Sequence, residues 1–152
     1  MKVIYCGTVD IHVCPNGCAS LLATVATVQQ DWKVDAEGSF VDVMTDAVQT
    51  VHEPDNGNTW TCLNCGAEAE LYENAAKYYV ALSDAGNDDF AIYIVDKETA
   101  FCSCSGEHYH DGLQKLEKSP TPGFLMGKTG AGRSFSIRID QGKSDYILSI
   151  SC

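Results

Sequence analysis

Two short cysteine loops, Cys14-Pro15-Asn16-Gly17-Cys18 and Cys62-Leu63-Asn64-Cys65-Gly66, decide how we expect the chain to fold. Two loops that each supply two thiolates can enclose Zn²⁺, which is bound tetrahedrally by four cysteines in closed structural sites. Gly17 and Gly66 suit the tight turns under such a metal, because glycine readily adopts a positive φ. The sequence therefore predicts one zinc site with the ligands Cys14, Cys18, Cys62 and Cys65.

The stretch from residue 10 to residue 70 resembles the zinc-ribbon proteins. The resemblance rests on the four cysteines, and an aromatic strand at Trp60 leads into the second pair. It departs from the usual pattern in the first spacing and in the 43 residues between Cys18 and Cys62. The resemblance implies a structural metal but no particular activity, because zinc ribbons share a local fold and differ in function.

Two disulfides or four free thiols are the alternatives to a metal site. A redox-active pair at Cys62 and Cys65 normally lies at the start of a helix that follows a strand. Here three carboxylates follow the pair, at Glu68, Glu70 and Glu73, and they would raise the pKa of a nearby thiol. This argues against redox catalysis.

The composition is that of a soluble globular protein. The chain has 152 residues, of which 45% are apolar and 20% are charged, close to ordinary values. No run reaches the roughly 18 to 20 apolar residues of a membrane span. Residues 1–7 lack the apolar core of a signal peptide, so we expect a cytoplasmic protein. In that compartment, eight cysteines favour metal binding over disulfides.

The formal net charge of −11 argues against binding to duplex nucleic acid. The charge is uneven, because residues 1–111 contain 4 lysines and 18 acids, whereas residues 112–152 contain 6 basic residues and 3 acids. A basic C-terminal part permits a small anionic ligand such as a nucleotide. A glycine-rich loop at 127–132 could bind it through backbone amides and side-chain cations. The candidate ligand-binding residues are Lys128, Arg133 and Arg138.

We expect a mostly β fold, with a zinc-ribbon-like domain at 1–74 and a β-rich domain at 75–152 that can pack as one body. In the first domain, period-two apolar patterns and turn residues predict one antiparallel sheet that zinc pins at one end. Its strands are expected at 2–13, with a bulge at Gly7, and at 22–34, 40–51 and 59–62. The spacing of Val41, Met44, Val48 and Val51 also fits an amphipathic helix, and the strand is preferred because its pairing partner precedes it. A turn is expected at 35–38.

The second half is predicted to be β-rich with one inserted helix. Residues 90–95 are continuously apolar, which is typical of a buried central strand. The helix is expected at Gly112–Lys118, with Asp111 as its N-cap and two prolines after its end. The other strands are expected at 78–82, 100–104, 134–140 and 145–151.

Residues 102–111 bring together two thiols, two imidazoles and two carboxylates. Alternate residues on a strand face the same way, so each thiol or imidazole pair can converge on a second zinc. The alternative is a buried cysteine pair next to polar residues. A metal-dependent hydrolase is the enzymatic alternative, although no further His or Asp cluster completes a catalytic site. The candidate ligands are Cys102, Cys104, His108 and His110.

The chain contains no recognisable pairing of a nucleophile with a base, so we expect a non-enzymatic binding or interaction protein with a structural zinc. Its partner is expected to be another protein or a second copy that pairs along exposed sheet edges. Sequestration of a small anionic ligand is the alternative. Short acidic chains of this kind suit phage-encoded or bacterial accessory proteins.

Overall fold

The computed structural model describes residues 1–84, 89–104, 110–141 and 146–151, and over these residues it contains strands and no helix. The mostly β prediction therefore holds, and the helix predicted at Gly112–Lys118 is wrong. That segment instead forms two short strands, β9 (Gln114–Lys115) and β10 (Glu117–Lys118). No helix in the described part of the chain is available to span a membrane.

The segment is extended because it crosses from one sheet to another. β9 pairs with one sheet and β10 with the other, and between them the Leu116 amide donates a hydrogen bond to the Ala100 carbonyl at 2.9 Å. Leu116 is only 2% exposed. A helix of this length would gain few internal hydrogen bonds after a costly nucleation. Burial of Leu116 between the sheets therefore decides the conformation.

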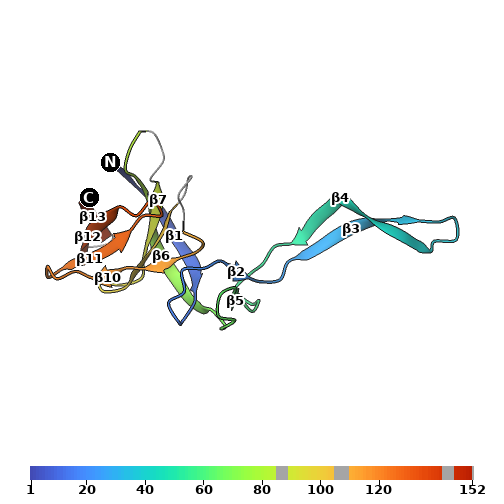
Figure 1. Cartoon of the computed structure of the whole chain (residues 1–152), viewed down its shortest axis with the longest axis horizontal. Coiled ribbons are helices and arrows are strands. Elements are labelled where there is room, and N and C mark those ends of the chain that lie inside the picture. Colours follow the sequence, from blue (N-terminus) through green and yellow to red (C-terminus); the bar gives the residue numbers. More distant parts are fainter. Residues whose placement is uncertain (85–88, 105–109, 142–145, 152) are drawn as a thin grey trace.

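Two antiparallel sheets form the body of the protein (Figure 1). The first has the order β1-β6-β7-β8-β9, and the second has the order β10-β11-β12-β13. The strands not yet defined are β1 (Lys2–Val13), β6 (Glu70–Ala81), β7 (Phe90–Ile94), β8 (Ala100–Cys104), β11 (Phe124–Lys128), β12 (Ser134–Gln141) and β13 (Tyr146–Ser151). β6 runs through residues 73–75, and the division into two domains near residue 74 stays a prediction.

The main core lies between these two sheets. β7 is the central strand of its sheet, and its Phe90, Ile92 and Ile94 side chains are buried, which confirms the predicted buried strand. Phe90 meets Phe135 of β12 with ring centroids 4.6 Å apart. Gly127 permits this packing, because a Cβ there would lie 2.7 Å from the Phe135 ring. The body is thus a β-sandwich built from both sheets.

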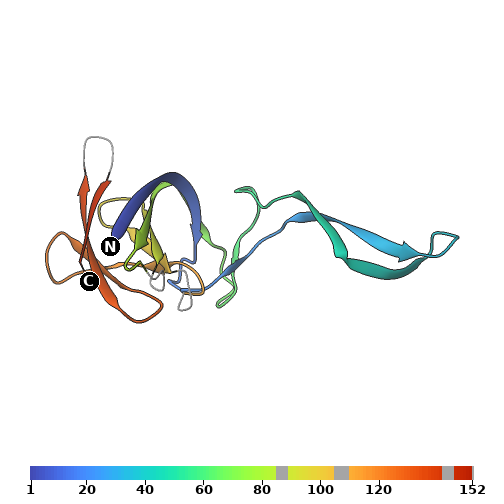
Figure 2. The same ribbon diagram turned by 90° about the horizontal axis from the view of Figure 1, so that it is seen from above.

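A long two-stranded arm projects from the body, as Figures 1 and 2 show. It consists of β3 (Thr27–Val34) and β4 (Phe40–His52), which pair with each other and with no other described strand. Every residue of β3 is exposed. The predicted turn at 35–38 closes the arm, with Gly38 at φ +87°.

The single sheet predicted for residues 1–74 is wrong. β1 pairs with β6, β3 pairs with β4, and the short strands β2 (Leu22–Ala23) and β5 (Thr61–Cys62) pair with each other. The strand predicted at 22–34 is accordingly divided into β2 and β3. The predicted bulge at Gly7 is present, with φ +101° and a shift in the β1–β6 register.

Candidate metal centre

The four cysteines of the two loops converge. Their sulfur atoms all lie within 4.8 Å of one another, and the Cys14 and Cys65 sulfurs are 3.5 Å apart. A tetrahedron with Zn–S bonds of about 2.3 Å has S···S edges of about 3.8 Å. The 3.5 Å separation is far longer than the roughly 2.05 Å of a disulfide bond, and all four cysteines are free. The set can therefore hold a metal ion.

Each loop is closed by the amide of its own glycine. The Gly17 amide donates to the Cys14 carbonyl at 3.1 Å, and the Gly66 amide donates to the Cys62 carbonyl at 2.9 Å. The two glycines have φ values of +74° and +73°. The predicted use of glycine at positive φ is confirmed in both loops. The first turn joins residues three apart and the second joins residues four apart, so the loops share the glycine conformation but differ in turn length.

Two asparagines connect the loops, and the sequence analysis did not assign them a role. Asn16 Nδ2 donates to the Cys65 sulfur at 3.4 Å, and Asn64 Nδ2 donates to the Cys18 sulfur at 3.3 Å. Each asparagine lies two residues after the first cysteine of its own loop and reaches a cysteine of the other loop. The shared Cys-x-Asn pattern was the available signal. Such donors stabilise the negative charge on thiolate ligands.

The cysteines of the cluster differ in the pKa of their thiols. The hydroxyl group of Ser20 lies 2.9 Å from the Cys62 sulfur, and this hydrogen bond lowers the pKa of Cys62 to about 6. Hydrogen bonding from Asn16 lowers the pKa of Cys65, whereas burial raises the pKa of Cys14 to about 11. Metals bind thiolates, so the hydrogen bonds to Cys62 and Cys65 favour the form that a metal takes, whereas Cys14 would have to lose a proton for a cation to bind there.

The cluster lies where the arm joins the body. Cys14 follows β1 of the body, and Cys62 lies in β5, between the arm and the body (Figure 1). Close by, Trp60 stacks on His12 of β1 with ring centroids 4.1 Å apart and planes 10° apart. Asp10 of β1 accepts a hydrogen bond from Asn56 at 2.6 Å. A metal here would tie the base of the arm to the sandwich.

The candidate second metal site is placed only in part. Cys102 and Cys104 are buried on β8 and belong to the main core. The Gly130 amide donates to the Cys104 sulfur at 2.9 Å, and His110 Nε2 lies 2.7 Å from the Lys128 carbonyl oxygen. Burial raises the pKa of Cys102 to about 12, which favours the protonated thiol.

His108 lies outside the described residues. In the described part of the chain, the group with metal-binding geometry is the four-cysteine cluster. A second zinc site in this region, and hydrolase chemistry there, stay predictions.

The three cationic residues proposed for anion binding are spread along the second sheet. Lys128 pairs with Ser134, whereas Arg138 pairs with Phe124 at the other end of β11. Four residues of strand separate these positions, about 13 Å. Arg138 also forms an ion pair with Asp140 at 3.0 Å. The structure therefore places Lys128 near Arg133, at the turn between β11 and β12, and places Arg138 away from both.

The glycine-rich loop uses its own amides in that turn. The Gly132 amide donates to the Thr129 carbonyl at 2.8 Å, and the Arg133 amide donates to the Thr129 hydroxyl at 3.2 Å. Gly130 donates to Cys104, as described above. Anion binding at this loop stays a prediction.

The fold and the site define a β-sandwich protein with a projecting arm and a four-thiol centre at its base. The chain matches no protein-family model, no curated protein and no solved structure. The interpretation of the site therefore rests on its geometry.

Proposed function

We propose that this chain is a non-enzymatic zinc-binding protein whose metal centre fixes the base of an interaction arm. The convergence of four cysteine sulfurs within 4.8 Å carries the proposal. Four thiolates complete the tetrahedral coordination of Zn²⁺, and a closed site of this kind leaves no position for a substrate or an activated water. The centre is therefore structural.

Zinc is favoured over other metals by the donor set. Four soft thiolates in a compact tetrahedral arrangement select zinc or iron over magnesium, calcium and manganese, which take oxygen ligands. The side chains around the sulfurs suit the same role, because Asn16, Ser20 and Asn64 can donate hydrogen bonds to three of them. These donors stabilise charge on the ligands and hold them in place.

Metal analysis of the purified chain tests the proposal. We expect one zinc per chain by mass spectrometry, and we expect Cys62→Ser to lose it, because Cys62 is a buried member of the cluster. Cys6→Ser is the matched control, since Cys6 is an exposed free cysteine outside the cluster. It should keep the zinc. A wild-type chain without metal, or with bound iron, would refute a zinc centre.

The same measurement addresses the second candidate site. Two zincs per chain that fall to one in the double variant Cys102→Ser/Cys104→Ser would place a metal at β8. One zinc, unchanged in this variant, would confine the metal to the four-cysteine cluster.

The interaction role rests on the arm. β3 and β4 bury almost none of their own surface against the body, so the arm adds nothing to the sandwich core. A projecting sheet of this length instead offers faces and edges to a partner.

A further inference from the structure

The directly paired residues on one face of the arm are uncharged. Directly paired residues of an antiparallel pair share a face, and alternate residues along a strand return to it. The β3–β4 register therefore places the following side chains on one face: Val28, Gln30, Trp32, Val34, Phe40, Val43, Val48 and Thr50. The Trp32 and Phe40 rings meet on it, with centroids 5.0 Å apart. We call this set the apolar arm face.

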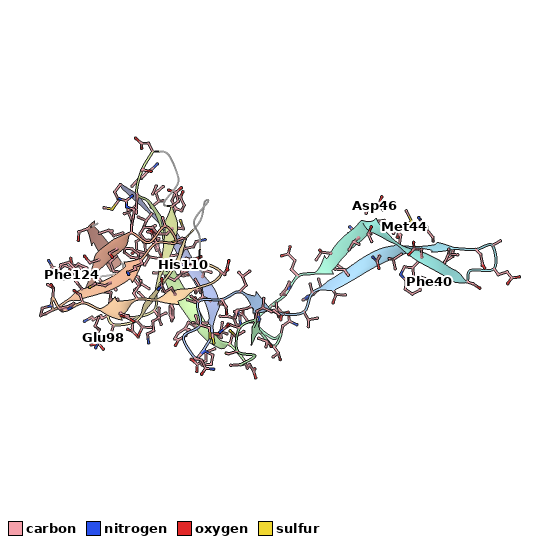
Figure 3. All side chains as sticks on the ribbon, in the orientation of Figure 1. Phe40, Met44, Asp46, Glu98, His110 and Phe124 are labelled. Carbon is pink, nitrogen blue, oxygen red and sulfur yellow. The ribbon has the colours of Figure 1, made fainter. Side chains whose placement is uncertain are left out.

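The opposite face is polar and charged. Lys33 pairs with Asp42, and Gln29 pairs with Gln49, while Asp31 alternates with Gln29 and Lys33 along β3. Figure 3 shows Phe40 on the side of the arm opposite to Asp46 and Met44. The paired charged residues of the arm thus lie outside the apolar arm face, although exposed apolar residues such as Val41 and Val51 also occur outside it.

The apolar arm face lacks a cover within the described part of the chain. Its large side chains, Val28, Trp32, Val34, Phe40 and Val48, are 48–59% exposed. An isolated two-stranded hairpin is marginally stable in water and needs further packing against an apolar face. A soluble protein rarely leaves a patch of this kind uncovered unless it is an interaction site.

The area of the face matches a small symmetric dimer. Taking about 150–250 Å² for a whole large side chain, the exposed fractions of the five large residues amount to about 500 Å² per copy. Two copies would bury about 1,000 Å², which reaches the lower bound for a specific interface. Two such faces can pack as a four-stranded sandwich about 10 Å thick.

The charge distribution of the chain bears on which partner could cover the apolar arm face. The chain has a net charge of −11, so two copies repel each other over most of their surface, but the apolar arm face carries no charge and permits close approach. A basic partner would be attracted to the acidic surface and not to this face. An anionic lipid surface would be repelled by Asp35 and Glu37 at the tip of the arm.

We infer that the apolar arm face docks against the same face of a second copy of this chain, related by a two-fold axis. The inference deepens the proposed function by naming the partner, and it rests on the interaction role of the arm. A two-fold axis makes the contact self-complementary and closes the assembly at two copies.

Light scattering of the whole chain, purified in zinc-containing buffer, after size exclusion at about 1 to 100 μM tests the inference with two matched variants. Val48→Glu adds a charge to the apolar arm face, and Gln49→Glu adds the same charge to the polar face at the next residue of β4. We expect the wild type and Gln49→Glu to double their mass from 16.4 kDa at high concentration. We expect Val48→Glu to raise the dissociation constant at least about tenfold, since it buries a charge.

If Val48→Glu fails to fold, Trp32→Ser tests the dimer instead, because it changes the apolar arm face without adding a charge. It should weaken the dimer because it removes the largest side chain of the face. A wild type that stays monomeric overturns the inference, as does equal association of Val48→Glu and Gln49→Glu. A monomer that sediments with phosphatidylcholine vesicles overturns it in favour of a lipid surface.

Zinc content in the same fractions separates the two proposals. A dimer without zinc would refute the metal centre and leave the docking face standing. A monomer with one zinc per chain would refute the docking face and leave the metal centre standing.

Discussion

Replacing Gly112 with alanine would place a methyl group where the Ser20 backbone already lies. A Cβ at Gly112 would be 1.9 Å from the Ser20 carbonyl oxygen, and real Cβ atoms essentially never approach below 3.0 Å. The Ser20 peptide and the backbone at residue 112 must therefore move apart by at least about 1.1 Å, the difference between 3.0 and 1.9 Å. Because the Ser20 hydroxyl lies only 2.9 Å from the Cys62 sulfur, a shift of this size is enough to break that contact.

Gly112→Ala is expected to affect both the stability of the fold and the binding of zinc. Gly112 has φ +138°, and a residue with a Cβ at positive φ costs about 1–3 kcal/mol. Displacement of Ser20 adds to this cost and removes a hydrogen-bond donor from a metal ligand. Loss of such a partner lowers metal affinity about 10- to 100-fold. We therefore expect Gly112→Ala to reduce both the free energy of unfolding and the affinity for zinc.

Gly123→Ala is the matched control. Gly123 also has a positive φ, +83°, but a Cβ there would meet nothing within 4 Å. It should show the conformational cost in urea unfolding and no change in a zinc competition titration against a chromophoric chelator. Ser20→Ala removes the hydroxyl without the backbone clash, and it should lower zinc affinity by a similar factor. Equal zinc affinities for Gly112→Ala and Gly123→Ala would refute the reasoning.

Three further predictions concern the body and the junction. Leu116→Ala should lower the free energy of unfolding, measured in urea, by about 2–5 kcal/mol, because removal of a buried leucine side chain leaves a cavity between the sheets. A loss below about 1 kcal/mol would contradict the placement of Leu116 in the core. Gly127→Ala should cost about 1–3 kcal/mol through overpacking against Phe135, and a neutral effect in the same assay would contradict the close approach of the sheets. Hydrogen bonds from the Asn74 amide and from Asn56 hold the pKa of Asp10 below its ordinary value, so an NMR titration should find it depressed. The stabilisation is present above the unfolded pKa of about 3.9 and is lost as pH falls through the folded pKa. An Asp10 that titrates at its ordinary value would show that these bonds do not persist in solution.

The metal centre was predictable because its chemistry is local. Cysteine spacing and the two glycines specify two chelating loops, and their convergence follows from the preference of Zn²⁺ for four thiolates. The donors Ser20, Asn16 and Asn64 were missed, since hydrogen bonds across 42 to 49 residues depend on how the loops face each other. Only the repeated Cys-x-Asn pattern carried that information.

The helix was mispredicted because an N-cap residue at Asp111 and two prolines after Lys118 resemble the start and stop signals of a helix. Leu113 packs against the small cluster around Phe101, whereas Leu116 enters the main core between the sheets. The two leucines therefore belong to two separate cores, and no single helix face could serve both. Start and stop signals cannot reveal this over a segment of seven residues.

Strand existence was more predictable than strand pairing. The alternation at 134–140 correctly indicated β12, and its pairing with β13 followed from a short connection. For residues 22–62, β-branched content indicated strands, but the choice of partner depends on tertiary packing. The period-two placement of Val28, Trp32 and Val34 did carry a further signal. It marks one apolar side of a strand, although it does not say whether that side is covered by the same chain.

The position of the metal centre explains how a small acidic protein can display an apolar arm. The sandwich has its own core and does not include the four cysteines, apart from the body strand that leads to Cys14. Among the described residues, the arm contributes to neither core cluster, and the residues around β2 and β5 connect it to the body. His12 and Trp60 are both partly exposed, so their stacking alone holds the long arm in a fixed direction only weakly. A four-coordinate metal bound there would add strong bonds at that junction. Under the proposed function it would fix the direction of the arm without enlarging either core, and the proposed two-fold contact between arms would require such a fixed direction.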